Sequence, residues 1–171
     1  MSTAPAGPET RHVSSDDLDW QEIGNGGRVE FRCKRLGLAA GGGGLGCSLV
    51  EVQPGRRSWP YHYHHANDEA LYVLAGRGRL RTPGGERPLR PGDYAGFPRG
   101  AGGAHQVLAD GDELLRYLCF STMLQPEIAV YPDSGKLGLF AGRPPGADPG
   151  PDDLVRFVPG DARVEYFAGE E

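Results

Sequence analysis

The sequence predicts an all-β domain, either a β-sandwich or a barrel, and three observations support this prediction. Glycine and proline together account for 43 of the 171 residues, 28 and 15 respectively. They punctuate short apolar segments every few residues, as expected for a chain of short strands joined by tight turns. No segment carries the apolar periodicity of a substantial helix, which excludes a helix bundle.

The N-terminal elements follow from local composition. Residues 1–20 are expected to form a flexible lead-in, in which Ser14–Trp20 offers helix-capping residues for at most one helical turn. Strands are predicted over Arg28–Leu38 and Leu45–Gln53, and the glycine-rich run between them is expected to be a loop.

A series of β-hairpins is predicted from Ala70 onward, with turns at three clusters of glycine and proline. Both faces of the last strand in this series are apolar, so it is predicted to lie between two layers. The predicted strands are Ala70–Ala75, Arg79–Thr82, Tyr94–Phe97, His105–Ala109 and Glu113–Ser121.

The strand pattern weakens after Tyr131. Arg143–Asp153 is rich in proline and glycine and is predicted to be a linker, and Leu154–Val158 and Val164–Phe167 are predicted to form a hairpin. The predicted organisation is therefore a lead-in over 1–20, a β-barrel over 21–142, and a linker with a C-terminal hairpin that packs on the barrel over 143–171.

Charge and cysteine content exclude several classes of protein. The formal net charge is −5 and no run of five lysines or arginines occurs, so a nucleic-acid partner has no electrostatic footprint. No apolar stretch approaches the length of about 18 residues that a membrane-spanning helix needs. The first residues lack a secretory signal pattern, and Cys33, Cys47 and Cys119 are too dispersed for a disulfide framework. We therefore expect a cytoplasmic protein without a membrane partner.

Four of the five histidines lie in the central third of the chain. His62 and His64 fall on an expected strand, where side chains alternate with period two, so both imidazoles project to the same side. Glu69 begins the next apolar run, and His105 begins a strand further along. Three imidazoles and one carboxylate suit one divalent transition metal ion (Fe, Mn, Ni, Co, Cu or Zn) and leave positions open for a substrate.

Side chains alternate between the two sides of a strand, so whether two residues have the same parity of position decides between neighbouring candidate metal ligands. Asp68 lies beside Glu69 and is an alternative ligand. Glu69, however, shares its parity with the apolar residues Leu71 and Val73, which favours an inward direction. His65 has the opposite parity to the pair of histidines before it and is expected to face away, in a loop or an interface.

Two segments carry a resemblance to a known family. The segment 55–76 resembles the first motif of the cupin superfamily, G-x5-H-x-H-x3-4-E-x6-G, although Gly55 stands six residues before His62 instead of five. The second motif, G-x5-P-x-G-x2-H-x3-N, is met by Gly92, Pro98 and Gly100. His105 then follows after four residues instead of two, which is expected to lengthen the preceding loop, and Ala109 replaces the asparagine.

The resemblance implies a cupin-type double-stranded β-helix, a jelly-roll barrel with short N-terminal and C-terminal extensions. It also implies that His62, His64, Glu69 and His105 bind the metal inside that barrel. Tyr131–Lys136 and Val164–Phe167 are similar to a subgroup of small bacterial single-domain cupins, some of them sugar-phosphate-isomerase-like. A homodimer is expected by the same resemblance, and because so many short strands leave sheet edges to cover.

Such a site predicts a metal-dependent enzyme that acts on a small polar metabolite. Iron or manganese would permit dioxygenase chemistry, whereas zinc, nickel or cobalt would suit an isomerase or lyase that works through an enediolate. A non-catalytic module that binds a small molecule or a metal, and a dedicated step in a specialised-metabolite pathway, are the alternatives.

The residues that would contact a substrate are harder to predict, and the pattern identifies no residue for proton transfer. Trp59, Tyr94 and Phe97 are candidates for the barrel mouth, and Arg99 is a candidate for binding an anionic group. The alternating arginines at 77, 79 and 81 form either a solvated or subunit-facing edge or a rim that steers anions.

Overall fold

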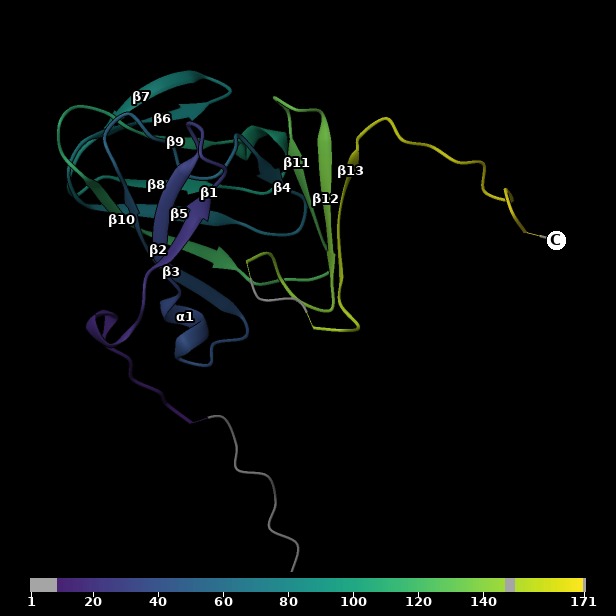
Figure 1. The fold of residues 1–171 in the computed structure, drawn as a ribbon, viewed down its shortest axis with the longest axis horizontal. Helices are drawn as coiled ribbons and strands as arrows, with labels where there is room; N and C mark the ends of the chain where they lie inside the picture. Colours follow the sequence, from purple (N-terminus) through teal and green to yellow (C-terminus); the bar gives the residue numbers. More distant parts are fainter. Residues whose placement is uncertain (1–8, 147–149, 171) are drawn as a thin grey trace, which may run out of the picture.

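The strands of every sheet in the protein pair in antiparallel fashion (Figure 1). The structure is a computed structural model that describes residues 9–146 and 150–170. The largest sheet contains, in spatial order, β1 (Gln21–Gly24), β2 (Glu30–Lys34), β3 (Leu45–Val52), β10 (Leu115–Thr122), β5 (Glu69–Ala75) and β8 (Tyr94–Phe97). A second sheet contains β13 (Leu154–Pro159), β12 (Lys136–Ala141), β11 (Glu127–Tyr131) and β4 (Tyr63–His64). The third contains β7 (Gly85–Leu89), β6 (Gly78–Thr82) and β9 (Gln106–Ala109). The prediction of an all-β fold is confirmed.

Helical structure in the described residues is confined to single turns. The 3-10 turn η1 (Ser15–Asp17) is capped by the Ser14 hydroxyl, which accepts a hydrogen bond from the backbone of Asp16 at 3.3 Å, as the sequence predicted. The others are α1 (Leu36–Ala39) and η2 (Ala101–Gly103). No helix in the described part of the chain is long and apolar enough to cross a membrane.

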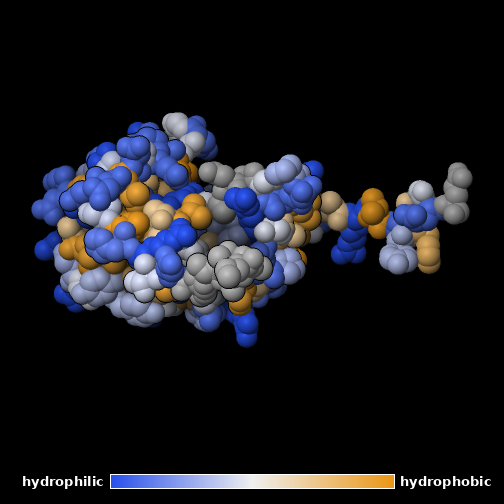
Figure 2. All heavy atoms as spheres, turned by 90° about the horizontal axis from the view of Figure 1, so that it is seen from below, coloured by the Kyte–Doolittle hydropathy of each residue, from blue (hydrophilic) through white to orange (hydrophobic). Residues whose placement is uncertain are grey.

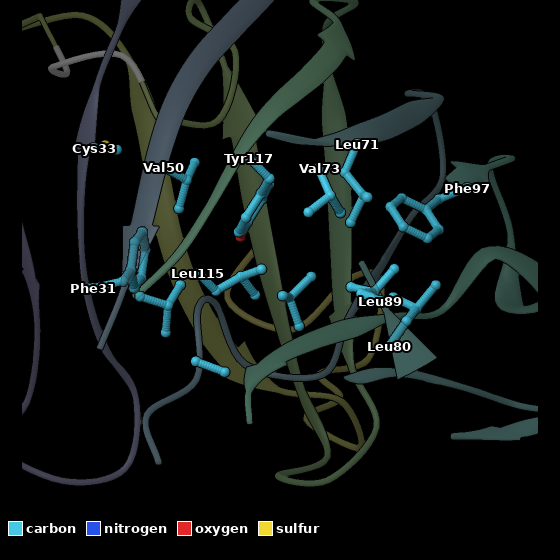
Figure 3. Close-up of a cluster of buried hydrophobic side chains, with 13 residues drawn as sticks. Phe31, Cys33, Val50, Leu71, Val73, Leu80, Leu89, Phe97, Leu115 and Tyr117 are labelled. Carbon is cyan, nitrogen blue, oxygen red and sulfur yellow. The ribbon is translucent and has the colours of Figure 1, made fainter. Parts of the chain in front are cut away.

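Strand β10 is the centre of the hydrophobic core. It pairs along its length with β3 on one side and with β5 on the other. Leu115 and Tyr117 point from β10 into a layer shared with Val50, Leu71 and Val73, and all five side chains are at most 2% exposed (Figure 3). The opposite face of β10 is only partly buried, so the predicted burial between two layers holds for one face.

Two predicted elements are corrected by the structure. The strand expected over Arg28–Leu38 ends at Lys34, because the backbone then closes one helical turn, in which Ala40 N–H donates to Leu36 O at 3.0 Å. The C-terminal hairpin does not form, because β13 pairs with β12 instead. Residues 161–170 extend from the barrel as an arm, on which Tyr166 is 87% exposed (Figure 2).

Four strands were not predicted from the sequence: β1, β7, β11 and β12. The last two matter most, because they join β13 to β4, the short strand that carries His64. The C-terminal third of the chain therefore forms the sheet on which part of the candidate site lies.

The buried layer around β10 predicts a clear difference between two leucines. Leu115→Ala removes a fully buried side chain and leaves a cavity, so we expect it to lower the free energy of unfolding by about 2–5 kcal/mol. Leu74→Ala on neighbouring β5 removes a side chain that is 41% exposed and should cost less than about 1 kcal/mol. Urea denaturation of both variants measures the difference, and equal losses would contradict this account of the core.

Candidate metal site

Backbone pairing brings the two motifs together. His62 and His105 form an antiparallel bridge in which His62 N–H donates to His105 O at 3.2 Å and His105 N–H donates to His62 O at 2.9 Å. Residues paired in this way project their side chains to the same side of the sheet. Both imidazoles therefore point into the barrel, and each is only 7% exposed.

The other two predicted ligands come from neighbouring strands. His64 pairs with Ala129 on β11, and Glu69 at the start of β5 pairs with Phe97 on β8. Asp68 is exposed, and its carboxylate accepts a hydrogen bond from the backbone of Arg99 at 2.9 Å. It therefore faces away from the histidines, as the parity argument predicted, and Glu69 faces them.

One carboxylate oxygen lies between the three imidazoles. Glu69 Oε2 is 3.6 Å from Nε2 of His62 and 3.3 Å from Nε2 of both His64 and His105. The ligand atoms of His62, Glu69 and His105 all lie within 4.8 Å of one another. Two ligands at about 2.1 Å from one ion are separated by about 3.0–3.4 Å, so the cluster needs little adjustment to bind a metal.

Carbonyl groups orient two of the imidazoles. Nδ1 of His62 lies 2.8 Å from the carbonyl oxygen of Pro60, and Nδ1 of His105 lies 3.0 Å from that of Gly103. Because a carbonyl only accepts, each Nδ1 carries the proton, and the lone pair of a neutral ring is on Nε2. That nitrogen faces Glu69, which is the arrangement that metal-binding histidines require.

The two extra residues before His105 contribute to this arrangement. The loop predicted over Ala101–Ala104 is tightened into η2, and Gly103 within it is buried. A Cβ on Gly103 would overlap the carbonyl oxygen of Pro98, so the close approach requires glycine. The insertion thus supplies the carbonyl that orients His105.

His64 is oriented by a carboxylate instead. Its Nδ1 lies 3.5 Å from Oε2 of Glu127, which is 1% exposed. Glu127 also accepts a hydrogen bond from the backbone of His65 at 2.9 Å and one from the side-chain amide of Asn67. Neither ring nitrogen of His64 makes a hydrogen bond of ordinary geometry. A buried imidazole with a free Nε2 beside Glu69 is the donor set expected of a metal ligand.

The cluster perturbs the protonation of its members. Burial favours a protonated Glu69, but the adjacent imidazoles of His105, His62 and His64 hold the pKa of its carboxyl well below the usual range. Burial also disfavours a charged His64, yet the carboxylates of Glu127 and Glu69 raise the pKa of that imidazole to about 9. Burial lowers the pKa of His62. A cation placed among these groups is therefore matched by a carboxylate that is already ionised.

A cavity of about 280 Å³ opens onto the cluster, with the four predicted ligands in its wall. The volume corresponds to about nine water molecules in the liquid, which suits a small metabolite. The ring of Phe97 stacks on His105 with centroids 3.7 Å apart, and Tyr131 lies parallel to His62 at 6.0 Å. Burial and the nearby charges of Glu69 and Glu127 raise the pKa of Tyr131 to about 12.

The structure separates the four predicted substrate contacts into two groups. Trp59 and Phe97 line the cavity. Tyr94 is 68% exposed, because it lies three positions from Phe97 on the same strand and therefore faces the opposite side of the sheet. Arg99 is also exposed and does not line the cavity, so the predicted contact between Arg99 and an anion in the barrel has no geometry to support it.

The alternating arginines of β6 have partners on the outside of the barrel. Arg79 pairs with Glu86 and Asp110, and Arg81 makes two hydrogen bonds, of 2.7 and 2.8 Å, to Asp133. Their charges are therefore balanced at the surface, as expected for a solvated edge.

Three residues of the site were missed by sequence analysis: Glu127, Tyr131 and Arg35. Glu127 and Tyr131 lie four positions apart on β11, and both face the histidines with Ala129 between them. This alternation would have identified them had the strand been predicted. Arg35 follows β2 and lines the cavity, but no local pattern distinguishes it from other arginines.

Fold and site together define a small β-barrel domain with a buried cluster of histidines and a carboxylate that can hold a divalent ion. Residues 48–121 match the family model of the cupin domain. This part of the chain is therefore a cupin domain, and the resemblance predicted from the two motifs is confirmed. The chain has no match among curated proteins.

Solved structures resemble the chain over most of its length. A proposed sugar phosphate isomerase of Acidithiobacillus ferrooxidans is 29% identical with a TM-score of 0.73, over 90% of this chain and 96% of its own. A sugar phosphate isomerase of the cupin superfamily from Silicibacter pomeroyi is 28% identical with a TM-score of 0.74, over 88% and 93%. A predicted oxalate decarboxylase of Thermotoga maritima is 24% identical with a TM-score of 0.58, over 66% and 99%, and is similar in fold alone.

The contact between His64 and Glu127 predicts that Glu127→Gln weakens metal binding. Glutamine keeps the size of the side chain but removes the charge that supports the imidazole, so we expect a loss of about 10- to 100-fold in metal affinity. Competition with a chelating dye measures it. Glu86→Gln, an identical change at an exposed glutamate of β7, should leave the affinity unchanged. Equal affinity for both variants would show that Glu127 does not support the metal ligand.

Proposed function

We propose that the protein is a metal-dependent enzyme and that its cavity holds one divalent transition metal ion through His62, His64, Glu69 and His105. The observation that supports this most strongly is the convergence of three Nε2 atoms on Glu69 Oε2, within 3.3–3.6 Å. A structural metal site would close the coordination sphere, whereas this cluster faces a cavity large enough for a small ligand.

The proposed reaction is isomerisation or a related lyase reaction of a small polar metabolite through an enediolate. The similarity over about nine-tenths of the chain to two proteins named as sugar phosphate isomerases favours this chemistry over dioxygenation. Bound in the cavity, the ion would act as a Lewis acid that polarises a hydroxyl or carbonyl oxygen.

The side chains of the cavity perform the remaining tasks. The Nδ1 contacts of His62 and His105 hold two imidazoles in fixed orientations before a substrate arrives. Tyr131 lies against His62 and carries a hydroxyl that can donate a hydrogen bond to a substrate oxygen. The aromatic rings of Trp59 and Phe97 occupy wall positions and limit the water that reaches the reacting atoms.

Metal content provides the first test. Protein purified without added metal should contain about one divalent transition metal ion per chain by elemental analysis, and His62→Ala should lose it. His65→Ala is a matched control, because His65 lies three residues away, is exposed, and contacts Tyr63 outside the cluster. An identical metal content in both variants and the wild type would disprove the proposed site.

Solvent exchange provides the second test. A panel of aldose and ketose phosphates in D₂O should show incorporation of deuterium beside the carbonyl group, because an enediolate exchanges that proton with the medium. The exchange should require His62 and not His65. Oxygen consumption without exchange would establish a dioxygenase instead, and metal-dependent ligand binding without either would establish a binding module. A homodimer and a cytoplasmic location remain predictions from the sequence.

A further inference from the structure

A single cationic side chain, other than the histidines, lines the cavity within the described residues. Arg35 immediately precedes α1 and lines the same cavity as the four candidate ligands. Leu38 and Gly146 line the cavity as well, so α1 and the segment that follows β12 both contribute to this wall. Figure 1 shows residues 142–146, which follow β12, toward the end of the barrel where α1 lies.

The guanidinium of Arg35 is held in place without a carboxylate. Its Nε donates to Oε1 of Gln21 on β1 at 2.8 Å, a neutral partner that orients the group but leaves its charge unbalanced. Arg32, three residues earlier, shows the alternative, because it pairs with Glu51 at 2.7 Å. No ion pair of Arg35 occurs in residues 9–146 and 150–170. Its two terminal nitrogens retain donors for a ligand.

The backbone at Gly146 closes over this guanidinium. A Cβ at Gly146 would overlap Nη1 of Arg35, so a larger residue here would displace the guanidinium, and the φ of 87° at this residue also favours glycine. The chain therefore confines Arg35 from one side while Gln21 fixes it from the other. An arginine restrained in this way loses less conformational entropy when it binds.

We propose that Arg35 binds an oxyanion of the substrate, a phosphate or a carboxylate, and thereby selects anionic metabolites for the metal cluster. This inference rests on the proposed function and names its substrate class. The planar fork of a guanidinium matches the oxygen atoms of these groups and binds them in a bidentate manner. The role that sequence analysis gave to Arg99 thus passes to a residue that lines the cavity.

Isothermal titration of the purified protein with inorganic phosphate, and separately with malonate, tests the proposal. Arg35→Gln should weaken binding of the preferred anion about 10- to 100-fold, because it removes a charge-assisted bidentate contact. Arg99→Gln makes the same change in net charge at an exposed arginine outside the cavity and should alter the affinity less than about 2-fold. Tighter binding of phosphate than of malonate identifies the substrate group as a phosphate, and the reverse identifies a carboxylate.

Two further variants make the outcome decisive. Arg35→Lys retains the charge without the fork and should show an intermediate affinity, and it replaces the glutamine variant if that protein does not fold. His105→Ala should lose the metal but keep anion binding within about 3-fold. The proposal is wrong if the wild type binds neither anion, or if Arg35→Gln and Arg99→Gln weaken binding equally. It is also wrong if only His105→Ala abolishes binding, which would mean that the anion binds the metal. Wild-type protein that binds the anion but contains no metal ion would count against the proposed function alone.

Discussion

The antiparallel bridge between His62 and His105 is the constraint on which the site depends. Two backbone hydrogen bonds, of 3.2 and 2.9 Å, join segments that lie far apart in the chain and set both imidazoles on one side. In each segment the imidazole is then oriented by the carbonyl two residues earlier, that of Pro60 or Gly103. The local backbone thus determines the orientation of these two side chains, so the site becomes preorganised as the chain folds.

Sequence analysis predicted the ligand cluster because its information is local. The period of two in a strand places His62 and His64 together and separates Glu69 from Asp68, and the structure shows both outcomes. The same rule places Tyr94 and Phe97, three positions apart on β8, on opposite sides of the sheet, so the prediction that both line the barrel mouth conflicted with it. Strand β11 does not show the usual alternation of apolar residues inward and polar residues outward, because its first residue, Glu127, is a buried charge whereas the apolar Ile128 is 41% exposed. The burial of Glu127 depends on Asn67 and on the backbone of His65, which only tertiary packing brings near.

The rest of the cavity was not predictable from local pattern for a related reason. Its wall joins the turn after β2 to the segment after β12, and more than 100 residues separate Arg35 from Gly146. No sequence pattern distinguishes Arg35, which lines the cavity, from a surface arginine. Several other arginines here are surface residues with carboxylate partners. Likewise the prediction of a C-terminal hairpin was wrong because β13 pairs with β12. Gly138 in β12 weakens the strand pattern by which that strand could have been predicted from the sequence.

Charge balance connects the two ends of the cavity. Glu69 contacts all three imidazoles, and Glu127 contacts His64 from the side away from Glu69, so two carboxylates lie in or next to the cluster that would hold one divalent ion. Their combined charge offsets that of the ion, and the cluster leaves no surplus positive charge for an anionic ligand. An anion that entered this cavity would need a cation elsewhere in the wall, since a buried charge without a partner is strongly disfavoured. Arg35, oriented by the neutral Gln21, is the group whose charge remains available for that purpose.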